Sequence, residues 1–383
     1  MRIAIDLTAT PKAKTGIGRY MLGLLEGLQQ IDSTNEYFLF VQDDDIDGFN
    51  VNASNFHMVP VHSKILRHQS IRIVWEQVIF PWRLKKNKID VLQCPNYTMP
   101  YPVKLIYPHL KVVGTFHDMT YFILEDCHVG WKREFFKHYI KRTAKKADKI
   151  ITISENSKKD IPNYCKLKNP DITVTYMGVK DAFFTAEAPD SKLLSEFGIP
   201  DTKYISYVGT LEPRKNVPGL LGAYALLPEE LRNEYKLVLM GKKGWLYDEI
   251  FERCQSDAKL KGNVYFTGYV PDEKMVRIVK GASCFVYPSF YEGFGIPVIE
   301  GMAAGVPTVT SYGSSLEEVA GDCCYLSDPK SEQSICDAII AALSADEDER
   351  RVKISGGIER ARNFNWKACA ENTVKAYEEA YKA

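Results

Sequence analysis

Short apolar runs alternate with helical patterns from one end of this 383-residue chain to the other. Such alternation is typical of parallel strands that are buried under helices on both faces of a sheet. The sequence therefore predicts an α/β fold with doubly wound, Rossmann-like sheets. The expected strands span residues 3–7, 37–41, 91–94, 112–116, 149–153 and 172–176, followed by 204–209, 236–240, 264–267, 284–287 and 308–310.

A segment with few apolar residues separates these two series of strands. Residues 181–202 contain Pro189, Gly198 and Pro200, which favour turns. The length of the chain allows two domains that each bury a core. We therefore expect one domain over residues 1–180, a second over 203–365, and a linker over 181–202.

The composition argues against several classes of protein. The 49 Lys and Arg residues match 49 Asp and Glu residues, so the charge gives no reason to expect a nucleic acid as partner. The nine cysteines form no Cys-x-x-Cys pair and no zinc-finger spacing, so neither a disulfide framework nor a bound metal is expected. The chain starts with a strand-like run and contains no apolar stretch long enough to span a membrane. These features predict a cytoplasmic protein.

The most informative motif follows the expected strand at residues 284–287. Glu292 and Glu300 lie eight positions apart around a turn with Gly293 and Gly295, and a helical pattern follows. Glycine lets the backbone approach a ligand closely, and the N-terminus of a helix attracts phosphate oxygens. Carboxylates accept hydrogen bonds from hydroxyl groups. The motif predicts a sugar-nucleotide site, although a tight turn with one capping carboxylate has the same local pattern.

Two adjacent cations follow the first strand of the second series. Arg214 and Lys215 come shortly after the strand at residues 204–209. Open α/β sheets bind ligands at the carboxyl ends of their strands, where Arg grips phosphate with two N–H groups and Lys adds a compact charge. Taken alone, the pair fits a solvated surface better. Together with Glu292 it predicts a phosphate site.

Two loops offer backbone groups to a ligand. Gly16 and Ile17 follow the first strand and open a helix, so their amides would meet a phosphate or an acceptor. The loop at Val270 follows the strand at residues 264–267, and its backbone would read the edge of a nucleobase. For both loops an ordinary strand-to-helix turn is the alternative.

One histidine also lies at a strand end. His117 follows the strand at residues 112–116, where its neutral imidazole would bond a sugar hydroxyl while Asp118 orients the ring. The alternative is a histidine that is satisfied within a polar loop.

The run from Glu292 to Glu300 resembles the Glu-x7-Glu motif of retaining glycosyltransferases of family 4, which have the GT-B fold of two facing Rossmann-like domains. The resemblance implies that Glu292 lies by the donor sugar and that Glu300 holds the ribose. It implies that a helix over about residues 366–383 returns to the first domain. The backbone amides implied to meet the diphosphate lie at residues 294–298 and include Phe294, Gly295, Ile296 and Val298.

The resemblance extends to the other strand ends. It implies that Arg214 and Lys215 neutralise the donor diphosphate; Thr210 stands where many family members have an Arg, so Arg214 must do more. His117 matches a histidine near the donor sugar, and Gly16 matches the glycine loop after the first strand. Residues 209–216 are similar to the corresponding part of mannosyl and related transferases of bacterial surface polysaccharide assembly.

These inferences predict a retaining glycosyltransferase that moves a sugar from a nucleoside diphosphate sugar to a glycan or lipid-linked acceptor, with neither metal nor cofactor. Asp-x-Asp patterns occur only in acidic runs at residues 43–47 and 346–348, which we place away from any strand end. Fixed cations would then stabilise the leaving diphosphate. A sugar-nucleotide epimerase of the same fold and a non-catalytic sugar-nucleotide-binding subunit are the alternatives.

The mechanism of retention has two interpretations. On chemistry alone, Glu292 is a candidate nucleophile that would form a covalent glycosyl intermediate. The resemblance implies instead that the acceptor attacks on the face from which the diphosphate leaves, while the diphosphate accepts the proton.

Two segments rich in cations and aromatic residues, at residues 65–88 and 131–149, resemble membrane-surface helices. In the second, Phe135, Tyr139 and Arg142 share one helical face. A surface helix that packs its aromatic residues on the sheet has the same pattern and is the interpretation we favour. Peripheral membrane contact is nevertheless implied by the resemblance, because many family 4 enzymes extend lipid-linked glycans at the inner face of a bacterial membrane.

Overall fold

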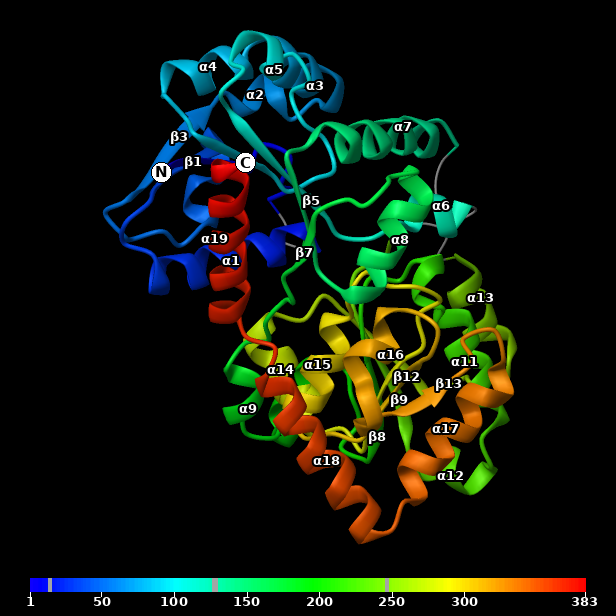
Figure 1. Cartoon of the computed structure of the whole chain (residues 1–383). Coiled ribbons are helices and arrows are strands. Elements are labelled where there is room, and N and C mark those ends of the chain that lie inside the picture. The colour runs from blue at the N-terminus through cyan, green and yellow to red at the C-terminus, as the bar shows by residue number, and fades with distance from the viewer. Residues whose placement is uncertain (13–15, 126–129, 245–247) are drawn as a thin grey trace. The chain divides into compact units, whose positions relative to one another are not determined.

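The computed structural model describes residues 1–12, 16–125, 130–244 and 248–383, and Figure 1 shows its helices and strands. Its internal contacts divide it into two compact units. The first unit comprises Met1–Gly178 and Asn365–Ala383, and the second comprises Val179–Phe364. Residues 13–15, which directly precede Gly16 in the glycine loop after the first strand, lie outside the described residues.

The first unit is a Rossmann-like domain with a seven-stranded parallel sheet in the order β3-β2-β1-β4-β5-β6-β7. Its strands are β1 (Arg2–Asp6), β2 (Glu36–Gln42), β3 (Phe56–Val61), β4 (Val91–Cys94), β5 (Lys111–Phe116), β6 (Lys149–Thr152) and β7 (Ile172–Val174). Its helices are α1 (Ile17–Ile31), α2 (Ser63–Leu66), α3 (Gln69–Val78), α4 (Phe80–Lys86), α5 (Val103–Ile106), α6 (Thr120–Ile123), α7 (Gly130–Lys146), α8 (Glu155–Cys165) and α19 (Trp366–Lys382), with a short 3-10 helix η1 (Asp43–Gly48).

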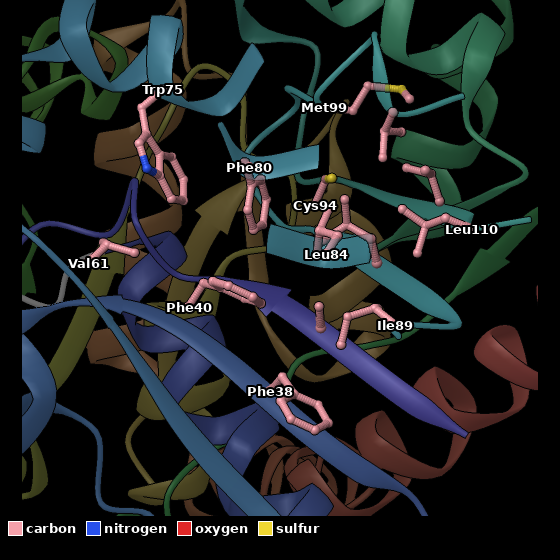
Figure 2. Packing of buried hydrophobic residues seen from close by; sticks show 14 of the residues in the cluster. Phe38, Phe40, Val61, Trp75, Phe80, Leu84, Ile89, Cys94, Met99 and Leu110 are labelled. Carbon is pink, nitrogen blue, oxygen red and sulfur yellow. The ribbon is translucent and has the colours of Figure 1, made fainter. Parts of the chain in front are cut away.

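Aliphatic and aromatic residues together form the core between this sheet and helices α3 and α4 (Figure 2). Trp75 stacks on Phe80 with ring centroids 5.0 Å apart, and Phe80 meets Phe40 of β2 edge-on at 4.9 Å. The last helix, α19, packs against α1 at Gly23, where an added Cβ would lie 2.1 Å from the ring of Trp366. The absence of a side chain at Gly23 therefore lets the end of the chain return to the first unit.

The second unit is also Rossmann-like, with a six-stranded parallel sheet in the order β10-β9-β8-β11-β12-β13. Its strands are β8 (Tyr204–Val208), β9 (Lys236–Met240), β10 (Val264–Gly268), β11 (Cys284–Tyr287), β12 (Thr308–Ser311) and β13 (Tyr325–Ser327). Its helices are α9 (Ala182–Thr185), α10 (Ser191–Glu196), α11 (Val217–Leu226), α12 (Glu229–Glu234), α13 (Asp248–Ser256), α14 (Asp272–Lys280), α15 (Ile296–Ala303), α16 (Ser315–Ala320), α17 (Glu332–Ser344) and α18 (Glu347–Arg362), and the 3-10 turns are η3 (Pro213–Lys215) and η4 (Gly321–Cys323).

The segment expected as a linker is folded into the second unit. Residues 181–202 form α9 and α10, and Phe183, Leu193 and Leu194 are buried. The carboxylate of Asp190 caps α10 by accepting a hydrogen bond from the amide of Leu193 at 2.8 Å. The linker prediction was wrong because a few well-placed apolar residues suffice to anchor two short helices.

All the predicted strands are present, with ends that differ by at most two residues. The strands β3 and β13 were not predicted. Both lie at the edge of a sheet, where β3 tolerates Pro60 and β13 is only three residues long. Short or proline-containing edge strands carry little of the apolar signal on which the prediction depends.

Candidate active site

The sheet of the second unit reverses its strand order between β8 and β11. Open α/β sheets bind ligands at such a reversal, beyond the carboxyl ends of the strands. The turn η3 after β8 carries Arg214 and Lys215, and the loop after β11 carries Glu292. These three predicted residues are therefore brought together at the place where the fold favours a ligand.

Glu292 is the centre of this cluster and is only 7% exposed. Its Oε2 accepts a hydrogen bond from Nη1 of Arg214 at 2.5 Å. Its Oε1 accepts from Nζ of Lys215 at 2.6 Å, from the hydroxyl of Ser289 at 2.7 Å and from the hydroxyl of Tyr287 at 3.0 Å. The carboxylate is thus held by four donors from two loops and a strand.

Electrostatics keep this buried carboxylate ionised. Burial raises the pKa of Glu292, but the charges of Arg214 and Lys215 outweigh it and bring the pKa down to about 2. Burial lowers the pKa of Lys215, and so does Arg214, although Glu292 opposes both. Arg214 also contacts Glu212, whose Oε1 lies 3.1 Å from Nη2. The cations Arg214 and Lys215 and the carboxylates of Glu212 and Glu292 therefore lie together in a site largely shielded from solvent.

Hydrogen bonds to backbone carbonyls fix the two loops to each other. The carbonyl of Arg214 accepts from the amide of Phe290 at 3.0 Å and lies 2.9 Å from the hydroxyl of Ser289. The side chain of Asn216, which has a φ of 56°, donates from Nδ2 to the carbonyls of Pro288 at 3.1 Å and Pro329 at 2.6 Å. These hydrogen bonds therefore hold the two loops of the cluster together.

The glycine turn after Glu292 leads directly into α15. Gly295 has a φ of 112°, and a Cβ there would lie 2.5 Å from Leu316, so only glycine fits. Helix α15 starts at Ile296 with Pro297 in its first turn, and its N-terminal end follows the Glu292 loop as predicted. Phe294 is buried at 2% exposure.

One of the predicted phosphate amides already has a partner within the protein. The amide of Val298 donates to the carbonyl of Gly295 at 2.9 Å, and the Val298 side chain is fully buried. The contact of Val298 with the diphosphate stays a prediction. Glu300, on α15, is 5% exposed, and its contact with a ribose stays a prediction.

The loop predicted to contact a base begins at the carboxyl end of β10. Val270 is 5% exposed, so only its backbone is suited to that role. Its neighbour Tyr269 is 59% exposed, and the ammonium of Lys242 lies 4.5 Å from the centre of its ring. The sequence does not by itself show that this ring is exposed. The available signal was an aromatic residue directly after Gly268, the last residue of β10.

His117 of the first unit is buried at the end of β5, at 7% exposure. Its Nε2 lies 2.9 Å from the carbonyl of Pro95 and donates to it, which leaves Nδ1 as an acceptor in the neutral ring. Burial lowers the pKa of His117, so the neutral form is favoured. The ring of Tyr20 on α1 meets the imidazole edge-on at 4.9 Å.

Asp118 does not orient His117, contrary to the prediction. Its Oδ1 accepts from the amide of Thr120 at 3.0 Å, from the Thr120 hydroxyl at 2.6 Å and from the hydroxyl of Tyr97 at 3.3 Å. A carboxylate two residues before a helix commonly bonds the backbone ahead of it. The carbonyl of Pro95 orients the imidazole instead.

Gly16 and Ile17 form the start of α1. Gly16 is exposed with a φ of 48°, and within the described residues no side chain caps the helix. Ile17 is half-buried and packs on a core cluster that includes Phe116 and Met119. The contact of the N-terminal end of this 15-residue helix with a ligand stays a prediction.

The acidic runs differ from their prediction in one respect. Asp43 directly follows the last residue of β2, so the run at residues 43–47 does lie at a strand end. Asp44 pairs with Lys12 at 3.0 Å and with Arg67 at 2.7 Å. In the other run, Asp346 caps α18 by accepting from the amide of Glu349 at 2.8 Å. Within the described residues no group of three or more His, Cys, Asp or Glu side chains is arranged to hold a metal ion.

Comparisons with known proteins identify the family. Residues 192–357 match the model "Glycosyl transferases group 1", and residues 14–183 match "Glycosyltransferase Family 4". O-antigen chain mannosyltransferase B of Escherichia coli is 32% identical over 372 residues, which cover 95% of this chain and 96% of that protein. The chain belongs to the glycosyltransferase family that these two models describe. The family prediction is confirmed, and the chain is a glycosyltransferase.

Solved structures of other glycosyltransferases share the fold. Sucrose-phosphate synthase of Thermosynechococcus elongatus has a TM-score of 0.81 and 21% identity, and the match covers 100% of this chain and 99% of that one. Alr3699/HepE of Anabaena, solved in complex with UDP and glucose, has a TM-score of 0.73 and 13% identity, over 99% of this chain and 100% of that one. These matches confirm the predicted GT-B class.

In this glycosyltransferase a second pair of buried acidic residues escaped prediction. Asp6 ends β1 and is 7% exposed, and Glu76 on α3 is 2% exposed. Burial and the charge of Asp6 raise the pKa of Glu76 to about 8, and burial raises the pKa of Asp6. Thr8 donates to Asp6 from its amide at 3.0 Å and from its hydroxyl at 2.6 Å. The available signal in the sequence was that Glu76 is the one acidic residue of α3.

Proposed function

We propose that this glycosyltransferase moves a hexose, with mannose favoured, from a nucleoside diphosphate sugar to a glycan or lipid-linked glycan acceptor. The observation that carries the proposal is the cluster of Arg214 and Lys215 around Glu292 at the strand-order reversal. The name of the 32% identical relative favours mannose. The UDP in the HepE structure favours a nucleoside diphosphate as the leaving group.

The same cluster supports a reaction without a metal. Negative charge grows on the diphosphate as the sugar leaves, and fixed cations in a buried site stabilise such charge without reorganising. Arg214 and Lys215 are buried enough to act in this way, with side chains 20% and 12% exposed. Activity that survives chelation by EDTA is the expected result, and full loss with recovery by Mg²⁺ would contradict it.

The contacts of Glu292 favour same-face attack over a covalent intermediate. A carboxylate that is held by four donors and has a pKa of about 2 is a weak nucleophile. We therefore propose that the acceptor hydroxyl attacks on the face from which the diphosphate departs. Mass spectrometry of the enzyme quenched during turnover tests this, because a glycosyl group on Glu292 would overturn it.

A transfer assay tests the proposed function itself. Purified enzyme is incubated with GDP-mannose or UDP-glucose and a bacterial O-antigen glycan, and the product is analysed by NMR. We expect a new glycosidic bond with the anomeric configuration of the donor and no turnover when the acceptor is omitted. Conversion of the sugar nucleotide without acceptor would indicate the epimerase, and binding without turnover would indicate the non-catalytic subunit.

The two segments considered for membrane contact differ in how far their apolar side chains are packed against the protein. On α7, the Tyr139 ring lies 5.5 Å from that of Tyr101, and the Arg142 guanidinium lies 4.0 Å from the Tyr101 ring centre. Phe136 stacks on Tyr121 at 4.7 Å. Helix α7 therefore packs its aromatic residues on its own unit, in keeping with the interpretation that we favoured.

Helices α2 to α4 have the opposite character. Their outer face exposes apolar side chains, of which Val74 is 61% and Trp82 58% exposed, together with Ile65, Ile71, Val78 and Ile79. Residues 63–89 contain seven Lys or Arg residues and one acidic residue, the buried Glu76. Apolar side chains beside cations suit the surface of an anionic bilayer. We propose peripheral membrane contact through this face; among the described residues no helix is long and apolar enough to cross a bilayer.

Vesicle flotation tests this contact. We expect binding to vesicles that contain phosphatidylglycerol and none to phosphatidylcholine vesicles. Val74→Asp with Trp82→Asp should abolish binding, whereas Trp131→Asp on α7, at a side chain 66% exposed, is the matched control and should retain it. Absence of binding by the unaltered protein at low salt would refute the contact.

A further inference from the structure

The ammonium group of Lys215 has three hydrogens to donate, and two of them have acceptors. Nζ lies 2.5 Å from the hydroxyl of Tyr287 and 2.6 Å from Oε1 of Glu292. Within the described residues Nζ has no third hydrogen-bond acceptor. One N–H is therefore left for a ligand at the strand-order reversal.

Tyr287 is placed to fix the direction of that N–H. It is the last residue of β11, is 1% exposed, and stacks on Tyr207 of β8 with ring centroids 5.9 Å apart. Burial raises the pKa of its phenol well above the ordinary value, so the hydroxyl keeps its proton. The hydroxyl donates this proton to Oε1 of Glu292 at 3.0 Å and accepts from Lys215. Lys215, Tyr287 and Glu292 thus form a closed ring of hydrogen bonds.

We propose that Tyr287 is a positioning residue that, together with Glu292, holds the ammonium of Lys215 so that its remaining N–H meets an oxygen of the donor diphosphate. This inference rests on the proposed function, which makes the diphosphate the ligand. Tyr287 acts through Lys215 and does not itself contact the donor. A flexible lysine that lost one of its two anchors would turn its charge away from the leaving group.

The phenol oxygen also affects the protonation of Lys215. An acceptor for the ammonium favours its charged form. The other charged groups around Lys215 are Arg214, which opposes that form, and Glu212 and Glu292, which favour it. Loss of the Tyr287 hydroxyl should therefore let Lys215 lose its proton at lower pH.

The test compares Tyr287→Phe with Tyr207→Phe in the transfer assay. Both variants lose a buried hydroxyl from the same ring stack, but the Tyr207 hydroxyl lies 3.4 Å from the carbonyl of Thr210 and makes no contact with Lys215 within the described residues. For Tyr287→Phe we expect kcat to fall about ten- to a hundredfold, as for a displaced catalytic group. We also expect the alkaline limb of the kcat/KM profile to move to lower pH. Tyr207→Phe should leave that limb in place.

A double-mutant cycle shows whether the effect passes through Lys215. In a Lys215→Ala background, Tyr287→Phe should cause no further loss, since the group that it positions is gone. Lys215→Arg is a second variant that keeps the charge but cannot occupy the same pair of anchors, and we expect a loss similar to that of Tyr287→Phe. An equal loss from Tyr287→Phe with and without Lys215, or an unmoved alkaline limb, would overturn the role of Tyr287. Failure of the unaltered enzyme to bind UDP and GDP would instead refute the proposed function.

Discussion

Each unit buries an acidic side chain at the reversal of its strand order, and the two behave in opposite ways. In the second unit Glu292 is ionised, with a pKa lowered to about 2 by Arg214 and Lys215. In the first unit Glu76 lies beside Asp6, and burial and that neighbour raise its pKa to about 8. Position in the fold is similar, so the neighbouring charges decide the protonation.

The difference shows what each site is suited to hold. The Glu292 cluster sets two cations in a buried place, which suits the phosphates of the proposed donor. The Asp6 and Glu76 pair retains a proton at neutral pH and so offers both a hydroxyl donor and acceptors. Two acidic side chains buried side by side, at 7% and 2% exposure, cost stability that the charge of Arg72 offsets in part.

The largest expected effect comes from Glu292→Gln. Removal of the carboxylate leaves Arg214 and Lys215 buried beside each other with less compensation, so we expect a loss of about 3–5 kcal/mol in the free energy of unfolding. Urea unfolding monitored by circular dichroism measures it. An unchanged midpoint would mean that Glu292 does not hold the cations.

Lys215→Ala tests how much the charge of this side chain contributes to catalysis. We expect a hundred- to thousandfold loss of kcat, about 3–4 kcal/mol, because a charge at the leaving group is lost. Lys203→Ala is the control, since Lys203 pairs with Glu234 on the surface at 2.6 Å. Equal activities of the two variants would remove Lys215 from the site.

Glu76→Gln should have the opposite sign to Glu292→Gln. A neutral amide removes the cost of burying a second acidic group beside Asp6, so we expect a gain of about 1–3 kcal/mol at pH 8. The gain should appear as a higher midpoint in the same urea experiment. Destabilisation similar to that of Glu292→Gln would erase the contrast between the two units.

The pH dependence of stability follows from the same pKa values. Because the pKa of Glu76 is about 8 when folded and 4.5 in its ordinary state, the folded protein binds more protons between these values. Its contribution to stability therefore falls as pH rises from 4.5 to 8. For Glu292, lowered to about 2, the contribution is present above 4.5 and is lost as pH falls toward 2. Unfolding curves of Glu76→Gln between pH 5 and 8 should lack the decline attributed to Glu76.

The smallest expected effect concerns Asp118→Asn. Asp118 bonds Thr120 and Tyr97, not His117, so we expect a loss of only about 1 kcal/mol in stability. The charge of Asp118 also raises the pKa of His117, so the acidic limb of the pH–rate profile should move to lower pH. An unmoved limb would mean that the charge of Asp118 does not reach His117.

Local pattern predicted much of this molecule. The buried strands and the position of Glu292, Arg214 and Lys215 followed from apolar runs and from the rule that parallel strands present ligand residues at their carboxyl ends. The contacts of Tyr287 and Ser289 with Glu292 could not be predicted, because they depend on how the loop after β11 folds back toward the end of its strand. The acidic pair at Asp6 and Glu76 escaped because its members lie 70 residues apart in the sequence.

Equilibrium binding of UDP and GDP to the unaltered protein and to Lys215→Ala tests the central claim most directly. If the cluster around Glu292 holds the donor diphosphate, one of these nucleotides binds the unaltered protein and binds Lys215→Ala at least about tenfold more weakly, as expected for a lost charged hydrogen bond. Calorimetry at fixed ionic strength measures both affinities, and the Lys203→Ala control keeps the original one. Equal affinity for Lys215→Ala and the unaltered protein would contradict the assignment of this cluster to the diphosphate.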